Sequence, residues 1–206
     1  MEDVIQRTDA WKALRLGKVT ASRVADVVAK TRTGYAASRA NYMAELVCER
    51  LTGKPTEGFS NAAMQWGTDQ EPFARDAYSA RTGELVTEVA FVQHPRITMA
   101  GASPDGLIGT SGNLEIKCPQ TATHIEYLLN REPPQEYFYQ MQWQMACTGS
   151  EWCDWVSYDP RMPENLQLLI VRIPRDDDAI RMLETEVESF LAELDDKVTK
   201  LKELSV

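Results

Sequence analysis

A change in hydrophobic period along the chain constrains the fold more than any other feature of the sequence. Apolar residues follow helical spacing through the first third, and short segments rich in β-branched residues follow from Leu85 to Cys118. Helical spacing returns around 124–129 and 136–146, before two further strand-like segments at 152–158 and 166–173. Such a chain buries its apolar faces when helices cover a sheet. We therefore predict an α/β fold with a central mixed β-sheet flanked by α-helices.

The element boundaries follow from caps and turn residues. Three early helices are expected: one through Val24–Val28 capped by Thr20 or Ser22, one after a 31–37 loop that ends near Gly53, and one from a Ser60 cap to Thr82. Pro72 should kink or split the third helix, because proline lacks an amide donor. The strand-like segments of the middle region are Leu85–Val92, Ile97–Ala100, Gly106–Ile108 and Leu114–Cys118.

The chain contains no internal repeat and no linker-like segment. Residues 1–206 are therefore expected to form one domain, ending in a long amphipathic helix at about 177–205 whose apolar residues recur at steps of three and four. No stretch approaches the ~20 apolar residues of a membrane span, and the N-terminus lacks the apolar core of a signal peptide. The four scattered cysteines are typical of buried thiols in a reducing cytoplasm.

Charge is distributed unevenly along the sequence. The formal net charge is −9, yet Lys12–Arg39 contains seven basic residues and one acid, while Asp176 to the C-terminus contains ten acids and four bases. Asymmetry of this kind points weakly to a polyanionic partner near the basic end.

One short stretch carries a candidate site. Glu115 and Lys117 lie two apart on a predicted strand, so their side chains leave the same face. If Gly109–Gly112 forms the turn, centred on Thr110, then Asp105 lies opposite Glu115. Two close carboxylates favour a hard divalent cation such as Mg²⁺, and the Ile116 carbonyl is a further candidate ligand. Taken alone, the pattern also fits a surface ion-pair cluster on a hairpin.

The surroundings of this stretch carry a resemblance. Pro104 and Asp105 with Glu115-Ile116-Lys117 resemble the PD-(D/E)XK nuclease signature, and the flanking blocks resemble the phage lambda exonuclease or YqaJ-type viral recombinase family. The matching blocks are Trp11–Gly17 with Thr20-Ala21-Ser22, Trp66-Gly67 with Glu71, Ala102–Leu107, Leu114–Pro119, Tyr137 with Gln140–Gln142, and Tyr158–Met162. They keep their order over about residues 9–175.

The resemblance implies a PD-(D/E)XK fold and a Mg²⁺-dependent 5′–3′ exonuclease on linear double-stranded DNA. Such an enzyme releases mononucleotides and leaves 3′ overhangs for recombination. It implies two Mg²⁺ ions, with Mn²⁺ as a substitute, a homotrimeric ring, a single-strand annealing protein as partner, and the cytoplasm of a bacterial or phage-infected cell. Asp105, Glu115 and the Ile116 carbonyl would hold metal, Lys117 would position water, and Glu71 would lie near the second ion. The positions around the 5′-phosphate match Arg15, Ser22, Ser103 and Gln140, with Gln142 less certain.

Simpler interpretations remain open for these residues. Arg15 and Ser22 also fit a solvated base and a helix cap. Because Gln140, Gln142 and Gln144 alternate, at most two of them share one helix face. Two rival functions also remain: a PD-(D/E)XK endonuclease of the restriction or junction-resolving type, and a non-catalytic DNA recombination scaffold.

Overall fold

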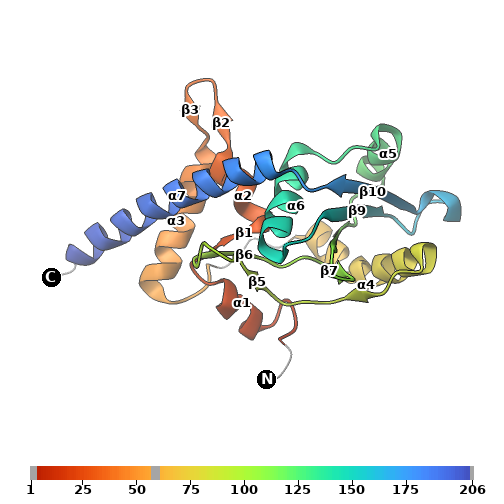
Figure 1. Cartoon of the computed structure of the whole chain (residues 1–206), viewed down its shortest axis with the longest axis horizontal. Coiled ribbons are helices and arrows are strands. Elements are labelled where there is room, and N and C mark those ends of the chain that lie inside the picture. The colour runs from red at the N-terminus through yellow and green to blue at the C-terminus, as the bar shows by residue number, and fades with distance from the viewer. Residues whose placement is uncertain (1–3, 57–60, 205–206) are drawn as a thin grey trace.

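A five-stranded mixed sheet forms the centre of the protein, for which the computed structural model describes residues 4–56 and 61–204. Its strand order is β10-β9-β8-β7-β4, with β9 and β10 side by side in Figure 1. Strands β8 and β9 are parallel, and the other pairs are antiparallel. The strands are β4 (Val86–Thr87), β7 (Gly106–Ile108), β8 (Gly112–Lys117), β9 (Trp152–Tyr158) and β10 (Leu168–Pro174). The predicted α/β class with a mixed sheet is confirmed.

Helices cover both faces of this sheet because the strand residues alternate. Leu114 and Ile116 of β8 pack with Val156 of β9 under α4 (Ala62–Thr82). Cys153 and Trp155 of β9 point to the other face, where α5 (Thr121–Asn130) and α6 (Gln135–Thr148) lie. Strand β8 is therefore buried between two helical layers, which explains its almost continuous burial.

A second, smaller sheet lies beside the first and joins the N-terminal region to the core. Its order is β1-β6-β5, with β1 (Val19–Thr20) parallel to β6 (Ala100–Ala102) and β5 (Val92–Gln93) antiparallel to it. The remaining elements are α1 (Asp9–Arg15), the 3-10 turns η1 (Ala21–Arg23) and η2 (Glu164–Leu166), α2 (Val24–Val28), α3 (Ala37–Thr52) and α7 (Asp177–Glu203).

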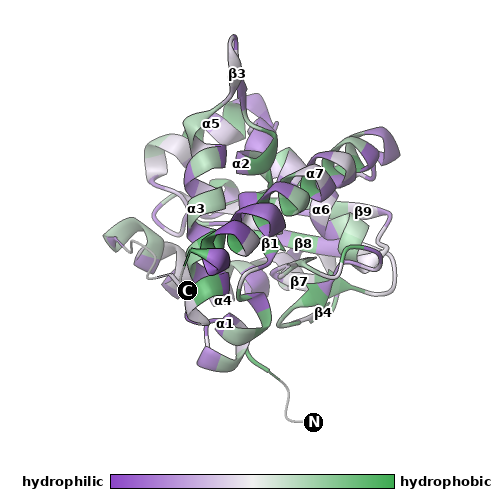
Figure 2. Ribbon diagram, turned by 90° about the vertical axis from the view of Figure 1, so that its left-hand side faces the viewer, coloured by the Kyte–Doolittle hydropathy of each residue, from purple (hydrophilic) through white to green (hydrophobic). Residues whose placement is uncertain are grey.

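Helix α7 packs on α2, α3 and α6 through its apolar stripe. Green and purple residues alternate along it in Figure 2, and Leu183, Val187, Phe190 and Leu194 are fully buried. The Asp176 side chain caps it by accepting from the amides of Asp178 and Ala179. None of the described helices has both the length and the apolar character needed to span a membrane.

Several predicted elements were wrong in detail. The α4 helix passes through Pro72 without a break, because burial of Glu71, Ala74 and Tyr78 against the core outweighs the lost hydrogen bond. The segment predicted as one strand at 85–92 forms β4 and β5, which belong to different sheets. The strand predicted at 97–100 begins at Ala100 instead.

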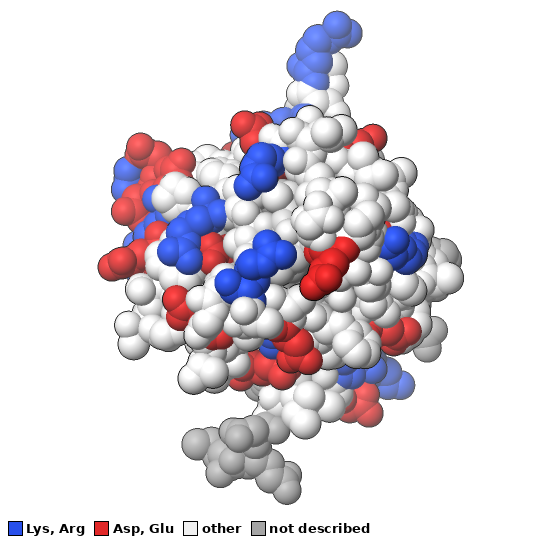
Figure 3. All heavy atoms as spheres, turned by 90° about the vertical axis from the view of Figure 1, so that its right-hand side faces the viewer, with Lys and Arg blue, Asp and Glu red and all other residues white. Residues whose placement is uncertain are grey.

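The expected loop at 31–37 contains most of a β-hairpin, made of β2 (Lys30–Thr31) and β3 (Gly34–Tyr35). This hairpin projects from the body (Figure 1), and basic groups occupy its tip (Figure 3). Two expected caps are also corrected: no side chain caps η1 or α2. Ser60 lies outside the described residues, and the Asn61 side chain caps α4 by accepting from Met64 N.

Candidate active site

The hairpin of β7 and β8 carries the central residues of the site. Its register ends with the pair of Gly106 and Leu114, and Asp105 and Glu115 are the residues that adjoin this pair on the two strands. Gly109 makes the turn possible with a left-handed φ of 56°. The Asp105 amide donates to the Leu114 carbonyl at 3.1 Å, and Asp105 Oδ2 accepts from the Ile116 amide at 2.7 Å. The Asp105 carboxylate is thus fixed at the end of β7.

Glu115 and Lys117 leave the same face of β8, toward α6. Lys117 Nζ lies 2.6 Å from Glu115 Oε1. The same oxygen accepts from Gln140 Nε2 at 2.7 Å, and Glu115 Oε2 accepts from Gln144 Nε2 at 2.5 Å. Glu115 is only 2% exposed, and a buried carboxylate needs such donors to remain charged. Two glutamines and a lysine therefore hold one buried negative charge in a single orientation.

The pairing of the glutamines follows from helical spacing. Gln140 and Gln144 are four residues apart on α6, so both face β8. Gln142 lies on another side of the helix, where it donates to the Pro174 carbonyl and accepts from the Asp176 amide. Gln142 was therefore the wrong candidate, and Gln144 takes its place beside Glu115.

Burial and neighbouring charge shift the ionisation of this cluster. Burial and the negative charges of Glu115 and Glu71 raise the pKa of Asp105 well above its usual range. Burial alone would lower the pKa of Lys117, but Glu115 and Asp105 outweigh it and raise that pKa. The lysine is therefore held in its charged form, whereas the ionised form of Asp105 is disfavoured.

Glu71 enters the same pocket from α4 and is 8% exposed. Its two oxygens accept from two arginines: Arg75 Nη2 reaches Oε1 at 2.9 Å, and Arg7 Nη2 contacts Oε2. Arg75 is one turn further along α4, whereas Arg7 lies just before α1. The structure therefore brings Glu71 to the Asp105 side of the pocket, as expected, with two arginine partners that the sequence analysis did not identify.

Arg15 and the serines form another part of the pocket wall. Arg15 Nη1 donates to Ser103 Oγ at 3.1 Å, and its guanidinium stacks on the Trp11 ring at 4.3 Å from the centroid. Trp11 Nε1 donates to the same Ser103 oxygen at 3.0 Å, and Ser22 lines the pocket as well. No carboxylate of the described chain forms a salt bridge with Arg15, so its charge is available to an anion.

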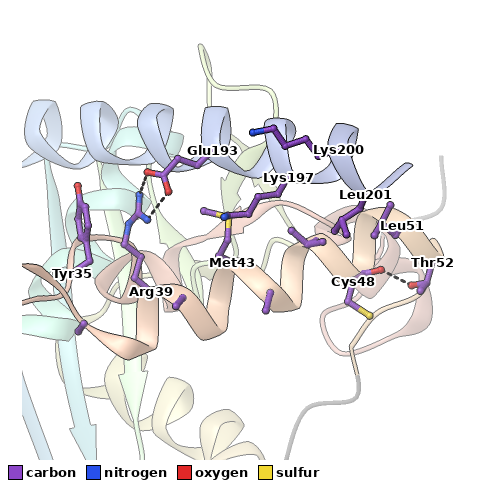
Figure 4. Close-up of a pocket in the computed structure, with 14 residues that line it drawn as sticks. Tyr35, Arg39, Met43, Cys48, Leu51, Thr52, Glu193, Lys197, Lys200 and Leu201 are labelled. Atoms are coloured by element: carbon purple, nitrogen blue, oxygen red, sulfur yellow. Dashed lines mark hydrogen bonds and ion pairs between the residues drawn. The ribbon is translucent and has the colours of Figure 1, made fainter. Parts of the chain in front are cut away.

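These groups surround one cavity of about 540 Å³. Nine of the ten residues expected at the site line it: Arg15, Ser22, Glu71, Ser103, Asp105, Glu115, Ile116, Lys117 and Gln140. Gln142 is the exception. A larger hollow of about 890 Å³ lies between α3 and α7 (Figure 4), where Arg39 pairs with Glu193 and the rest of the lining is mostly aliphatic. Its lining includes neither the Asp105–Glu115 pair nor Lys117, so the smaller cavity is the candidate active site.

The donor set of the pocket fits a hard divalent cation. Within residues 4–56 and 61–204, no three Asp, Glu, His or Cys side chains are grouped to hold a metal ion by themselves. The pocket offers the carboxylates of Asp105 and Glu115 and the Ile116 carbonyl, with the arginine-paired carboxylate of Glu71 beside them. That carbonyl faces the Asp105 side of β8, because the Ile116 amide does so. Mg²⁺ typically takes few protein oxygens and completes its shell with water and phosphate.

The sequence analysis missed several residues that contact the site, and for some of them the sequence contained a usable pattern. The i,i+4 spacing could have identified Gln144 with Gln140 and Arg75 with Glu71. Tyr137, whose ring lies 4.4 Å from Lys117 Nζ, was present only as part of a matching block. Arg7 left no signal, because nothing in its neighbours indicates that the chain folds back over the pocket.

An Asp–Glu–Lys cluster on a hairpin of a central mixed sheet, covered by helices, defines an α/β nuclease of the PD-(D/E)XK class. Residues 10–151 match the YqaJ-like viral recombinase domain, and the chain belongs to that family. A comparison with curated protein sequences found no match.

Solved structures agree with this assignment. An alkaline exonuclease (LHK-Exo) from Laribacter hongkongensis is 56% identical, with a TM-score of 0.91 over 96% of this chain and 98% of that chain. A second structure, of LHK-Exo in complex with dAMP, is 57% identical over the same shares of the two chains, with the same TM-score. A phage-related exonuclease from Haemophilus somnus 129PT, at 14% identity and a TM-score of 0.74 over 89% of this chain and 96% of that chain, shares the fold.

Proposed function

We propose that this protein is a Mg²⁺-dependent exonuclease that degrades the 5′-ended strand of linear duplex DNA. It releases 5′ mononucleotides and leaves 3′ overhangs for single-strand annealing. One observation carries the proposal: a single pocket joins the Asp105–Glu115–Lys117 cluster to the Arg15–Ser103 pair. The first group suits hydrolysis of a phosphodiester, and the second suits binding of a terminal phosphate. An enzyme that measures from a phosphorylated end needs both.

The roles of the residues follow from their contacts. Asp105, Glu115 and the Ile116 carbonyl would hold the cation, and Glu71 would lie near a second ion. A bound Mg²⁺ would lower the pKa of its water and stabilise the charge that develops on the phosphate, and Mn²⁺ would substitute for it. Lys117, held by Glu115 and by Gln140 Oε1 at 3.3 Å, would orient the attacking water. Arg15, Ser103 and Ser22 would bind the 5′-phosphate, with Gln140 between the two groups.

The relatives support a DNA end as the substrate. LHK-Exo, the similar protein from Laribacter hongkongensis, is described as an alkaline exonuclease and has been crystallised with dAMP. A nucleoside monophosphate is the product expected of a nuclease that removes one nucleotide at a time. The net charge of −9 is compatible with DNA binding because acidic and basic groups are interspersed on the face shown in Figure 3, so a basic path need only be local.

The proposal extends to assembly and setting. A homotrimeric ring would keep the enzyme on DNA of any sequence, and closed symmetry would satisfy head-to-tail contacts without forming filaments. We expect it to act in the cytoplasm of a bacterial or phage-infected cell, together with a single-strand annealing protein. Light scattering should give about three times the 23.2 kDa chain mass, and a monomer mass at micromolar concentration would contradict the ring.

Digestion of end-labelled DNA tests the activity. Linear duplex labelled separately at the 5′ and 3′ ends is incubated with Mg²⁺, with Mn²⁺, or with EDTA, beside a closed circular duplex. We expect early release of 5′ label as mononucleotide, no cutting of the circle, and no release in EDTA. Cutting of the circle would indicate an endonuclease, and no release with either metal would indicate a scaffold.

A further inference from the structure

The N-terminal segment folds back onto the rim of the active-site pocket. Gln6 Nε2 donates to the Val89 carbonyl at 2.8 Å and to the carbonyl of Pro104, next to Asp105, at 2.9 Å. Gln6 and Arg7 both line the pocket together with Glu71 and Asp105. The segment before α1 is therefore fixed beside the carboxylate cluster.

Arg7 and Arg75 hold Glu71 differently. Arg75 belongs to the same helix as Glu71, its side chain is 14% exposed, and it also pairs with Glu88 at 3.1 Å. The Arg7 side chain is 46% exposed, and Glu71 is its only salt-bridge partner in the described chain. The Arg7 guanidinium can therefore dissociate from Glu71 with a smaller loss of contacts than the Arg75 guanidinium.

The backbone of Arg7 is also unusual. Its φ of 71° lies in the left-handed region, which side chains other than glycine, asparagine and aspartate rarely adopt. Such a conformation persists when neighbouring contacts hold it, and it clusters at functional sites. Here the holding contacts are those of Gln6 on one side and the Thr8 cap of α1 on the other.

We propose that Arg7 is a positioning residue that occupies Oε2 of Glu71 in the metal-free protein and is displaced when a divalent cation binds. This inference rests on the proposed function. Arg7 and a cation beside Glu71 are attracted by the same carboxylate and exclude each other from its Oε2, so each weakens the binding of the other. Arg7 thereby keeps Glu71 partly neutralised while no cation is bound and raises the cation concentration at which the site fills.

Binding of Mn²⁺ to the DNA-free protein tests this role without measuring catalysis. The electron paramagnetic resonance signal of free Mn²⁺ is titrated with the parent, Arg7→Ala, Arg7→Gln and Arg7→Lys. Both neutral variants should bind Mn²⁺ about threefold to fivefold more tightly, the upper part of the range for a partly exposed ion pair, while Arg7→Lys stays within about twofold of the parent. Arg181→Ala, which removes an equal charge from an exposed pair on α7, should bind as the parent does.

The outcomes separate this role from the proposed function. Equal or weaker Mn²⁺ binding by both neutral variants would overturn the role of Arg7, provided that the parent binds and Asp105→Asn does not. If the parent fails to bind Mn²⁺, or Asp105→Asn binds as well as the parent, the metal site itself is wrong. Thermal unfolding tests whether each variant is folded. If Arg7→Ala is not folded, Arg7→Gln alone tests the role of Arg7.

Discussion

Replacing Gln144 by alanine should slow catalysis strongly while leaving the pocket otherwise intact. The change removes the donor to Oε2 of Glu115, while Lys117 and Gln140 still hold Oε1. The carboxylate is then free to rotate about its remaining contacts. Since Glu115 is a proposed cation ligand, this rotation should lower the rate of the hydrolytic step.

The expected loss of rate follows from the burial of the hydrogen bond between Gln144 and Glu115. A hydrogen bond to a buried charged group contributes about 1.5–3 kcal/mol, and each 1.36 kcal/mol corresponds to about tenfold in rate. If the whole contribution is expressed in the transition state, turnover at saturating Mg²⁺ should fall by about tenfold to about 150-fold. Single-turnover release of 5′-labelled nucleotide measures this, and urea unfolding measures the accompanying loss of stability.

Gln142 provides the matched control on the same helix. It is equally buried and makes two hydrogen bonds, to Pro174 and Asp176, away from the pocket. Gln142→Ala should therefore destabilise the fold to a similar degree and leave the single-turnover rate within about twofold of the parent. The reasoning is refuted if both variants slow the reaction equally, or if Gln144→Ala stays within threefold of the parent.

Four further predictions concern other parts of the site and its support. Arg15→Ala should slow digestion of 5′-phosphorylated ends about tenfold to a hundredfold and of 5′-hydroxyl ends little, and equal slowing of both would make Arg15 a general backbone contact. Asp105→Ala should abolish cleavage but keep duplex binding, so residual cleavage within tenfold of the parent would contradict the role of Asp105. Lys117→Ala should be nearly inactive yet still bind Mn²⁺, and normal turnover would show that Lys117 is only a structural ion-pair partner. Burial opposes ionisation of Asp159, but hydrogen bonds from Arg161 outweigh burial and lower the pKa of Asp159 to about 2. The ionised side chain therefore stabilises the fold fully at a pH above the pKa of the unfolded state, and this stabilisation is lost as the pH falls toward 2. Urea unfolding of the parent should lose roughly 1 kcal/mol more than Asp159→Asn between pH 5 and pH 3, and parallel pH profiles would refute this.

The sequence predicted the elements whose hydrophobic period and turn residues lie within the element itself. The strands at 152–158 and 106–108 and the α6 helix were placed to within a few residues, because period and turn chemistry specify them. The division of 85–92 between two sheets was not predictable, since pairing with β7 or with β6 depends on chain segments far away. Likewise, Pro72 breaks an isolated helix but not one whose buried face is held by the sheet.

The site was predictable where one turn fixes two residues. Centring the turn on Thr110 was enough to bring Asp105 opposite Glu115. Arg7 was not predictable, because its contact with Glu71 spans 64 residues and depends on a left-handed backbone at its own position. Helical spacing pairs Gln140 with Gln144, but only the packed structure shows that this face of α6 meets β8.

The parallel pairing of β8 with β9 has a consequence for the synthesis of the protein. Strand β8, which carries two of the proposed metal ligands, emerges from the ribosome well before β9, and α5 and α6 lie between them in the sequence. Until residue 158 has been made, β8 lacks a neighbour on one edge, and until α6 has been made Glu115 has no glutamine donors. An incomplete chain therefore carries every acidic residue of the pocket without a formed active site, so cleavage of DNA must wait for nearly the whole domain to be translated.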